Sequence, residues 1–164
     1  GLEETFFDHL VERHVTAMRI NYYPARDTPA PEGQIRAGAH SDYGMMTILM
    51  GEDEPGSLQV QTRDGRWIDV ETRPEFFVIN IGDLMARWTN DRWVSTLHRV
   101  ANPPGNGNSM DRISLVFFQM PNHDAHISCI ESCIGGGAKY PAATYTEHYM
   151  DKLMKAAHAR LDAG

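Results

Sequence analysis

The sequence predicts a mostly β fold, an antiparallel sandwich or barrel with a helix at each end of the chain. Short apolar runs typical of strands recur between residues 16 and 120, about every 8–20 residues, with turn residues between them. No helical pattern interrupts these runs, whereas a parallel α/β sheet would need a helix after each strand. The segments on either side of this region instead have apolar residues at helical spacing.

Two amphipathic helices are expected, one over residues 2–14 and one that starts near Thr144. Thr144 and Glu147 have the spacing of a capping box, which marks the start of a helix. The first apolar stripe consists of Leu2, Phe6, Phe7, Leu10 and Val11, and the second of Tyr145, Tyr149, Leu153, Ala157 and Leu161.

The strands are expected where the apolar runs occur. Pro24 ends the first run, because proline has no backbone N–H to donate to a sheet. Asp64-Gly65 predicts a hairpin turn, because glycine tolerates a positive φ. In chain order, the predicted strands are 16–23, 44–50, 57–62, 66–70, 76–82, 93–100, 112–120 and 126–130.

Composition excludes several classes of protein. The 164 residues fit one domain, and the net charge of −7 argues against a nucleic-acid-binding face, which needs a stripe of Lys and Arg. No apolar run approaches the ~20 residues that span a bilayer, so a membrane is not an expected partner. Two cysteines, Cys129 and Cys133, form no disulfide framework and suit the reducing cytoplasm. We therefore expect a cytoplasmic protein.

His40-Ser41-Asp42 is the first motif that could bind a metal. On an extended segment, residues i and i+2 project to the same side, so the imidazole and the carboxylate can converge. Alone, this pair also fits a solvated loop. His98, in a later strand run, likewise fits a histidine on a sheet face that bonds a neighbouring carbonyl.

Together, His40, Asp42 and His98 match the two-histidine, one-carboxylate facial triad of non-haem iron. This donor set leaves open coordination positions and suits Fe(II), whereas structural zinc sites are tetrahedral and commonly use thiolates. The sequence therefore predicts an iron centre.

Arg112-Ile113-Ser114 begins the clearest strand run. Arg112 and Ser114 share a face by the period-2 rule, so a guanidinium and a hydroxyl point to one place. An inward-facing arginine is costly unless it meets an anion, because an unpaired buried charge costs several kcal/mol. Asn21 and Tyr23 share a face of an earlier run. A metal triad beside an Arg–Ser pair suits a 2-oxoacid that chelates the metal at one end.

In chain order, these motifs resemble one known family, the iron(II)/2-oxoglutarate-dependent oxygenases of the isopenicillin N synthase-like group. The resemblance is collinear over almost the whole chain. The matching segments are RINYYP (19–24), GAHSDYGMMTIL (38–49), GSLQVQTRDGRWIDV (56–70), VINIGDLMARWTNDRWVSTLHRVANP (78–103), DRISLVFFQMP (111–121) and SCIGGGAKYPAATYTEHYM (132–150).

The resemblance implies a double-stranded β-helix, or jelly roll, with flanking helices. It also implies that His40, Asp42 and His98 are the iron ligands and the catalytic residues. Members of the family usually have an N-terminal region of helices and strands before the segment that matches here. We therefore expect residues 1–164 to be a single catalytic domain that lacks this region.

The resemblance also implies roles for the polar residues of the first and last strand runs. Arg112 and Ser114 correspond to the partners of the distal carboxylate of 2-oxoglutarate. Tyr23 corresponds to a hydrogen-bond donor to this cosubstrate, and Asn21 to a residue near its metal-bound end.

The implied activity is that of a non-haem Fe(II)- and 2-oxoglutarate-dependent dioxygenase that uses O2 to hydroxylate or desaturate a small molecule and releases succinate. Related oxidases use iron and O2 without 2-oxoglutarate and retain similar motifs, so that alternative stays open. The third hypothesis is a non-catalytic jelly-roll fragment. We expect a monomer, and the motifs do not define the substrate.

Overall fold

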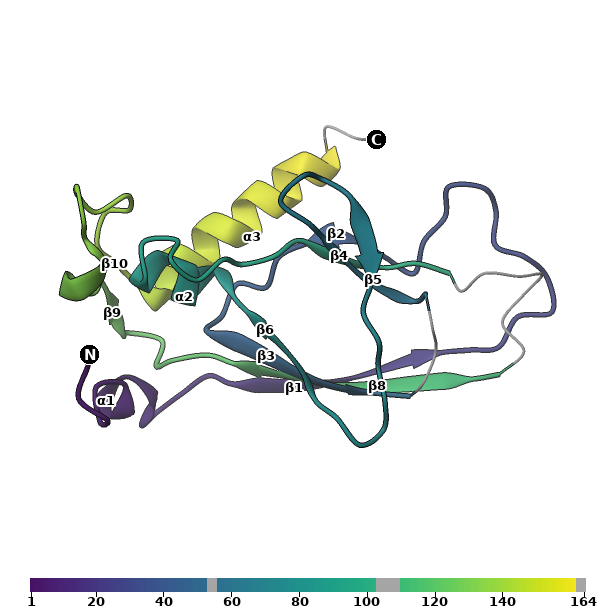
Figure 1. Ribbon diagram of the computed structural model, residues 1–164, viewed down its shortest axis with the longest axis horizontal. Helices are drawn as coiled ribbons and strands as arrows, with labels where there is room; N and C mark the ends of the chain where they lie inside the picture. The colour runs from purple at the N-terminus through teal and green to yellow at the C-terminus, as the bar shows by residue number, and fades with distance from the viewer. Residues whose placement is uncertain (53–55, 103–109, 162–164) are drawn as a thin grey trace.

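The fold is mostly β, as predicted, and two antiparallel sheets enclose the interior of the domain in a jelly roll (Figure 1). The computed structural model describes all residues except 53–55, 103–109 and 162–164. Strands that are neighbours in a sheet are mostly distant in sequence, so the chain crosses repeatedly between the sheets. The first sheet contains, in spatial order, β1 (Ala17–Tyr23), β8 (Arg112–Gln119), β3 (Met46–Gly51) and β6 (Val78–Ile81). The second contains β2 (Ala37–His40), β7 (His98–Val100), β4 (Leu58–Gln61) and β5 (Trp67–Asp69).

The remaining elements gather at one end of the sheets. A two-stranded ladder joins β9 (His126–Ile127) to β10 (Ala143–Thr144). The helices are α1 (Asp8–Val11), α2 (Asp83–Trp88), the 3-10 turn η1 (Glu131–Cys133) and α3 (Tyr145–Leu161). Of the helices in the described ranges, none combines the length and the hydropathy that crossing a membrane requires.

Strand β8 is an inner strand of the first sheet, and its side chains alternate between the two faces of that sheet. It pairs with β1 on one side, from Ala17↔Phe118 to Tyr23↔Arg112, and with β3 on the other. Arg112 and Ser114 are buried, whereas Ile113 and Phe117 are exposed. The alternation predicted from period 2 is therefore present, and it directs the polar residues inward.

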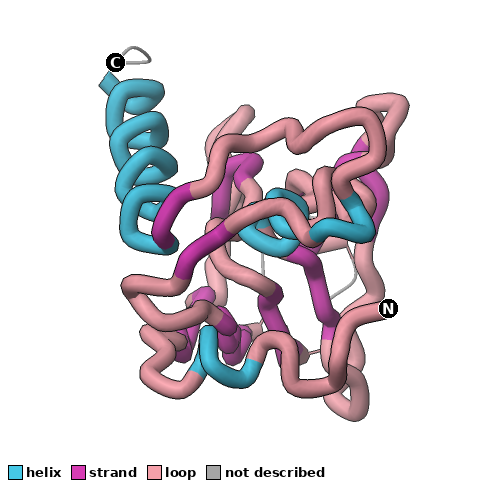
Figure 2. The backbone as a smooth tube through the Cα atoms, turned by 90° about the vertical axis from the view of Figure 1, so that its left-hand side faces the viewer, coloured by secondary structure: helices cyan, strands magenta, loops and turns pink. Residues whose placement is uncertain are grey.

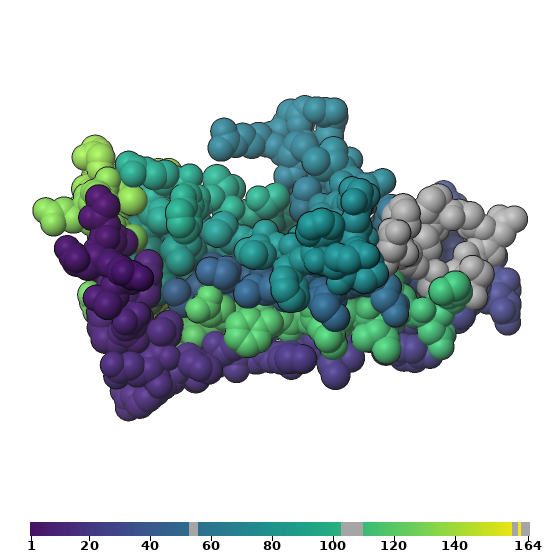
Figure 3. All heavy atoms as spheres, turned by 60° about the horizontal axis from the view of Figure 1, so that its bottom comes forward, coloured from purple at the N-terminus to yellow at the C-terminus, as the bar shows by residue number. Residues whose placement is uncertain are grey.

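The other side of this sheet is an outer apolar face. The atoms of β1 and β8 run side by side across the surface on this side of the molecule (Figure 3). Ile20 keeps 65% of its surface exposed, which is far from the usual burial of isoleucine. The exposed members of the outer apolar face are Met18, Ile20, Tyr22, Met50, Ile79, Ile113 and Phe117.

The hydrophobic core lies at the end of the sheets where the helices meet. Trp88 and Leu84 of α2 are among its most buried residues, and Tyr145 of α3 joins them. Phe7 packs its ring edge against Trp88 with centroids 5.3 Å apart. The cluster consists of Leu10, Met45, Leu84, Met85, Trp88, Ala125, Ile127, Ile130 and Tyr145. Because this end supplies the core, the space between the sheets is available for polar groups.

The predicted helix over residues 2–14 is wrong in extent. Only Asp8–Val11 is helical, and turns precede it. A helix this short has little intrinsic stability in water. Instead, contacts of Phe6, Phe7 and Leu10 with the core determine the path of this segment.

The region from 76 to 100 also differs from the prediction. The run 76–82 is a strand only over β6, and Asp83 begins α2, a helix within the predicted β region. The run 93–100 is a strand only over β7, because a turn at Asn90 and Asp91 with positive φ redirects the chain before it. Strand β2 was not predicted.

Helix α3 begins as predicted, with a reciprocal capping box. The Glu147 carboxylate accepts the Thr144 N–H at 2.7 Å, and the Thr144 hydroxyl accepts the Glu147 N–H at 3.2 Å. Bonds from the Thr144 backbone and side chain lower the pKa of Glu147. Only the first turns of the apolar stripe are covered, since Tyr145 is buried and Leu161 is 78% exposed. Figure 2 accordingly shows the later turns clear of the other segments.

Two glycines allow the loop after β2 to approach both α2 and the end of β8 closely. A Cβ atom on Gly82 would lie 2.2 Å from the carbonyl oxygen of Gly44, and one on Gly44 would lie 2.7 Å from that of Gln119. The Gly82 and Leu84 N–H groups donate to the carbonyls of Met45 and Gly44. Glycine is therefore required at both positions.

We predict that Gly82→Ala destabilises the domain by about 1–3 kcal/mol or more, because backbone must move to admit the methyl group. The free energy of unfolding from urea titrations measures this loss. Gly38→Ala is the matched control, since open space surrounds Gly38, and it should change stability by less than about 0.5 kcal/mol. Equal effects of the two substitutions would contradict the role of close contact.

Candidate metal centre and anion site

The two histidines of the predicted triad come from paired strands of the second sheet. His40 ends β2 and is the cross-strand partner of His98, the first residue of β7. Their ring centroids lie 4.3 Å apart. The sheet therefore brings together two imidazoles that are 58 residues apart in the sequence (98 − 40).

Backbone carbonyls orient both rings. His40 Nδ1 lies 2.7 Å from the carbonyl oxygen of Gly38, and His98 Nδ1 lies 3.1 Å from that of Thr96. A carbonyl accepts only, so each Nδ1 carries a proton, and in the neutral ring it is Nε2 that offers a lone pair. Fixing the tautomer in this way is how proteins prepare histidine to bind a metal.

Asp42 supplies the third donor from the loop between β2 and β3. The Thr47 hydroxyl and the Asn80 amide donate to Oδ2 of Asp42 at 2.6 Å and 2.8 Å. The same oxygen lies 3.7 Å from Nε2 of His98. Thr47 and Asn80 are cross-strand partners on β3 and β6, so the first sheet holds the carboxylate while the second holds the imidazoles.

The donor set fits one divalent metal ion. The ligand atoms of His40, Asp42 and His98 all lie within 4.8 Å of one another. Two bonds of about 2.1 Å keep their donor atoms no more than ~4.2 Å apart, so small side-chain adjustments bring all three onto one ion. Two imidazole nitrogens and one carboxylate oxygen are the donors of the facial triad.

Arg112 lies in the interior and connects the two sheets. It is 4% exposed, and its Nη1 donates to the hydroxyl of Ser57, next to β4, at 2.8 Å. Its guanidinium carbon lies 4.9 Å from the ring centroid of Tyr23, at the distance of a cation–π contact. The guanidinium carbon of Arg36 also lies 5.1 Å from the centroid of the Tyr23 ring. Two guanidinium groups therefore lie within cation–π distance of the Tyr23 ring.

Ser114 completes this second cluster. It is 2% exposed, its cross-strand partner on β1 is Asn21, and the Asn21 amide lies 3.4 Å from the Ser114 hydroxyl. Its partner on β3 is Gly51, and a Cβ atom there would lie 3.8 Å from Nη2 of Arg112. Hydroxyl, amide and guanidinium groups together form a donor-rich site suited to a carboxylate.

The family model for the 2OG-Fe(II) oxygenase superfamily matches residues 15–121, more than half of the chain. The chain belongs to this superfamily. A 2-oxoglutarate-Fe(II) type oxidoreductase of Emericella nidulans, hxnY, is 36% identical over 99% of the chain and 46% of that protein. Validamycin A dioxygenase of Streptomyces hygroscopicus is 32% identical over 93% of the chain and 42% of that enzyme.

Solved structures agree with the fold of this oxygenase-family chain. A full-length Neurospora crassa protein in complex with alpha-KG superposes with a TM-score of 0.84 and 33% identity, over 92% of this chain and 47% of that one. The chain spans about half the length of these relatives. The predicted jelly-roll class is confirmed.

The structure brings the predicted site residues together in two clusters. His40, Asp42 and His98 form the first; Asn21, Tyr23, Arg112 and Ser114 form the second. Their assignment as ligands and cosubstrate contacts stays a prediction.

Sequence reasoning missed the supporting residues Thr47, Asn80 and Ser57. For Thr47 and Asn80 a signal existed, because each is a polar residue within an apolar strand run. Ser57 had no such signal, because its bond to Arg112 exists only once both sheets are in place.

Proposed function

We propose that this protein is a non-haem Fe(II)- and 2-oxoglutarate-dependent dioxygenase that oxidises a small organic molecule and converts 2-oxoglutarate to succinate. The observation that carries the proposal is the convergence of His40 and His98, from paired strands, and Asp42, from the loop after β2, onto one point. The superfamily match and the similarity to named 2-oxoglutarate-Fe(II) oxidoreductases support it.

In this proposal His40, Asp42 and His98 hold the iron. The metal supplies the activation of O2 that couples decarboxylation of 2-oxoglutarate to oxidation of the substrate. The Gly38 and Thr96 carbonyls hold the Nδ1 side of each ring, so Nε2 is the nitrogen that faces the metal position. Thr47 and Asn80 hold the Asp42 carboxylate toward the same point.

Arg112 and Ser114 bind the distal carboxylate of 2-oxoglutarate in this proposal. Arg112 supplies charge-assisted hydrogen bonds, and its burial excludes water that would weaken them. Ser57 holds the guanidinium, Tyr23 adds a hydrogen bond to the cosubstrate, and Asn21 lies at the side toward its metal-bound end.

The substrate class we propose is a small molecule rather than a macromolecule. The net charge of −7 supports the absence of nucleic acid among its partners, and the two free cysteines support a cytoplasmic location. We propose a monomer.

We predict that Asp42→Ala abolishes iron-dependent turnover of 2-oxoglutarate, because two histidines alone hold Fe(II) weakly. Anaerobic addition of Fe(II) and 2-oxoglutarate to the parent protein should produce a weak visible charge-transfer band, and succinate should form in air. Asp42→Asn keeps the shape and acceptor of the carboxyl group and controls for folding. Retained succinate formation by Asp42→Ala would contradict the assignment, and iron binding without any response to 2-oxoglutarate would favour the oxidase alternative.

We predict that Arg112→Ala raises the apparent Kd for 2-oxoglutarate about 10-fold to 100-fold, the usual cost of lost hydrogen bonds to a charged group. Iron binding without cosubstrate should remain close to that of the parent protein. Titration of the charge-transfer band measures both quantities. Arg66→Ala, at the exposed turn between β4 and β5, is the control and should alter neither. An unchanged requirement for 2-oxoglutarate would remove Arg112 from the carboxylate site.

We also propose that residues 1–164 form one catalytic domain and that a further segment of a longer protein covers the outer apolar face. A large exposed apolar patch marks an interface. The relatives supply the second argument, since each contains roughly as much chain again outside the matched region. The expected N-terminal region is the occupant we propose.

We predict that Ile20→Lys costs less than about 1 kcal/mol in the isolated domain, where the side chain is exposed. In the full-length protein the same charge would be buried, and the cost should exceed about 2 kcal/mol. Urea unfolding of both forms measures the difference, with Arg66→Ala as the control. An equal cost in both would mean that the face stays uncovered.

A further inference from the structure

The loop that carries Asp42 is held by contacts outside the sheets. Strand β2 ends at His40, its register with β7 shifts between Ala37 and His40, and β3 starts only at Met46. The ladder of backbone hydrogen bonds therefore does not determine the position of Asp42. Thr47 and Asn80 hold its carboxylate, and the main chain of the loop is held by further contacts.

Three consecutive residues of this loop are tethered. The Ser41 hydroxyl donates to Oδ2 of Asp83 at 3.0 Å. The Asp42 carbonyl accepts the backbone N–H of Asp83 at 2.7 Å. The Tyr43 carbonyl lies 3.0 Å from Nε2 of His148. Two of the tethers lead to Asp83 and the third leads to α3.

Asp83 is itself held by α3. Nζ of Lys152 lies 2.7 Å from Oδ2 of Asp83, the same oxygen that accepts the Ser41 hydroxyl. The Asp83 side chain is only 11% exposed and that of Lys152 34%. An ion pair sheltered to this degree is screened less than a surface pair, and removal of one partner leaves a charge in a poorly hydrated place.

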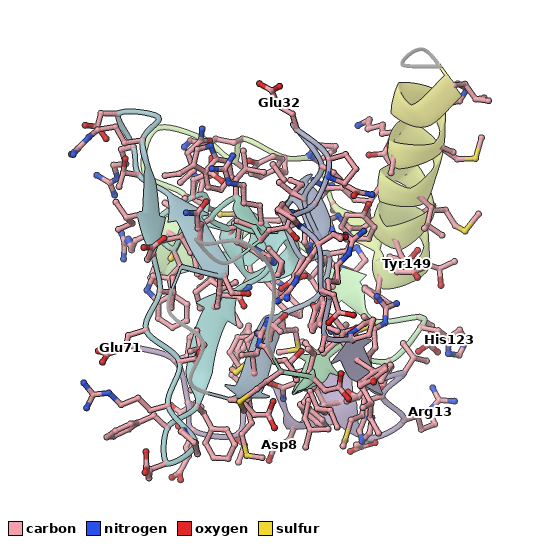
Figure 4. The ribbon with its side chains drawn as sticks, turned by 90° about the vertical axis from the view of Figure 1, so that its right-hand side faces the viewer. Asp8, Arg13, Glu32, Glu71, His123 and Tyr149 are labelled. Atoms are coloured by element: carbon pink, nitrogen blue, oxygen red, sulfur yellow. The ribbon has the colours of Figure 1, made fainter. Side chains whose placement is uncertain are left out.

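The contacts that α3 makes with Tyr43 and Asp83 come from one face of the helix. His148 and Lys152 are four residues apart and thus neighbours on the helix, and Tyr149 places its ring 6.0 Å from that of Tyr43. Tyr149 lies at the base of α3 in Figure 4, where the helix meets the body of the domain. His148 is buried, and burial is the main cause that lowers its pKa, so the neutral ring donates to Tyr43.

We propose that Lys152 is a positioning residue for the metal centre, which acts through Asp83 and Ser41 to hold Asp42 in line with His40 and His98. This inference rests on the proposed function for the identity of the metal. The buried first half of α3 is then part of the support of the site.

The test compares Lys152→Met with Lys155→Met. Lys155 pairs with Asp151 on the exposed surface of the same helix, so its loss removes an equal charge without contact with Asp83. Lys152→Met should raise the Kd for Fe(II) several-fold, up to the roughly tenfold that removing a direct partner of a ligand costs, because Lys152 lies one contact further out. Lys155→Met should leave it unchanged, and Lys152→Arg should restore much of the affinity.

Amide hydrogen exchange of the metal-free protein provides a readout that needs no iron. Peptides covering 38–46 should exchange faster in Lys152→Met than in Lys155→Met. Unchanged exchange and unchanged Kd in Lys152→Met would overturn the inference while leaving the proposed function intact. Failure of the parent protein to bind Fe(II) would instead overturn the proposed function and this inference with it.

A double-mutant cycle with Ser41→Ala separates this path from general destabilisation. If Lys152 acts through Asp83 on Ser41, the double variant should bind Fe(II) about as weakly as the weaker single variant. Additive losses in the free energy of iron binding would show independent effects and would overturn the path through Ser41.

Discussion

The close contact between Gly44 and Gly82 is the constraint on which the rest of the site depends. It brings three successive N–H groups at the start of α2 against the carbonyls of Met45, Asp42 and Gly44. The first N–H groups of a helix have no partner within the helix, so the loop that carries Asp42 also caps α2. A side chain at Gly82 would push α2 away from this loop and break these bonds, and one at Gly44 would push the loop away from Gln119 at the end of β8. The start of α2 and the position of the Asp42 loop therefore depend on the same hydrogen bonds.

The position of the hydrophobic core explains how the interior can hold charge. Leu84 and Trp88 bury their side chains at the helical end of the domain, together with Tyr145. Between the sheets, Asp42 and Arg112 are buried among hydroxyl and amide groups that bond to them. Burying a charge is unfavourable unless hydrogen bonds compensate, so these partners are a condition of the fold as well as of the site. The end cluster supplies the stabilisation that a polar interior lacks.

The sequence predicts the parts of the molecule that are set by local pattern. Strands β1 and β8, the turn at Asp64-Gly65 and the start of α3 follow from alternation, turn chemistry and capping. The residues of the triad are proposed from the His-x-Asp motif and the family resemblance. Helix α2 and strand β2 could not be predicted, because each is short and exists through partners distant in sequence. Asn80 stands out in the sequence as a polar residue in an apolar run, but its partner does not, because what Asn80 and Lys152 contact depends on where Asp42 and Asp83 lie after folding. Tertiary contacts, rather than propensity, decide these elements.

The two clusters differ in how firmly the backbone holds them. Arg112 and Ser114 lie on the central strand, whose pairing on both sides is regular, and a slip of one residue would turn Ile113 inward and expose the arginine. The anion site is therefore as rigid as the sheet itself. His40 and Asp42 instead lie where the pairing of β2 becomes irregular and ends. Ligands at such an edge can shift the few tenths of an ångström that coordination needs, while side-chain bonds from Ser41 and Thr47 limit how far they move. In the proposed function, a fixed anion site beside adjustable metal ligands would let one end of a chelating cosubstrate set the position of the other.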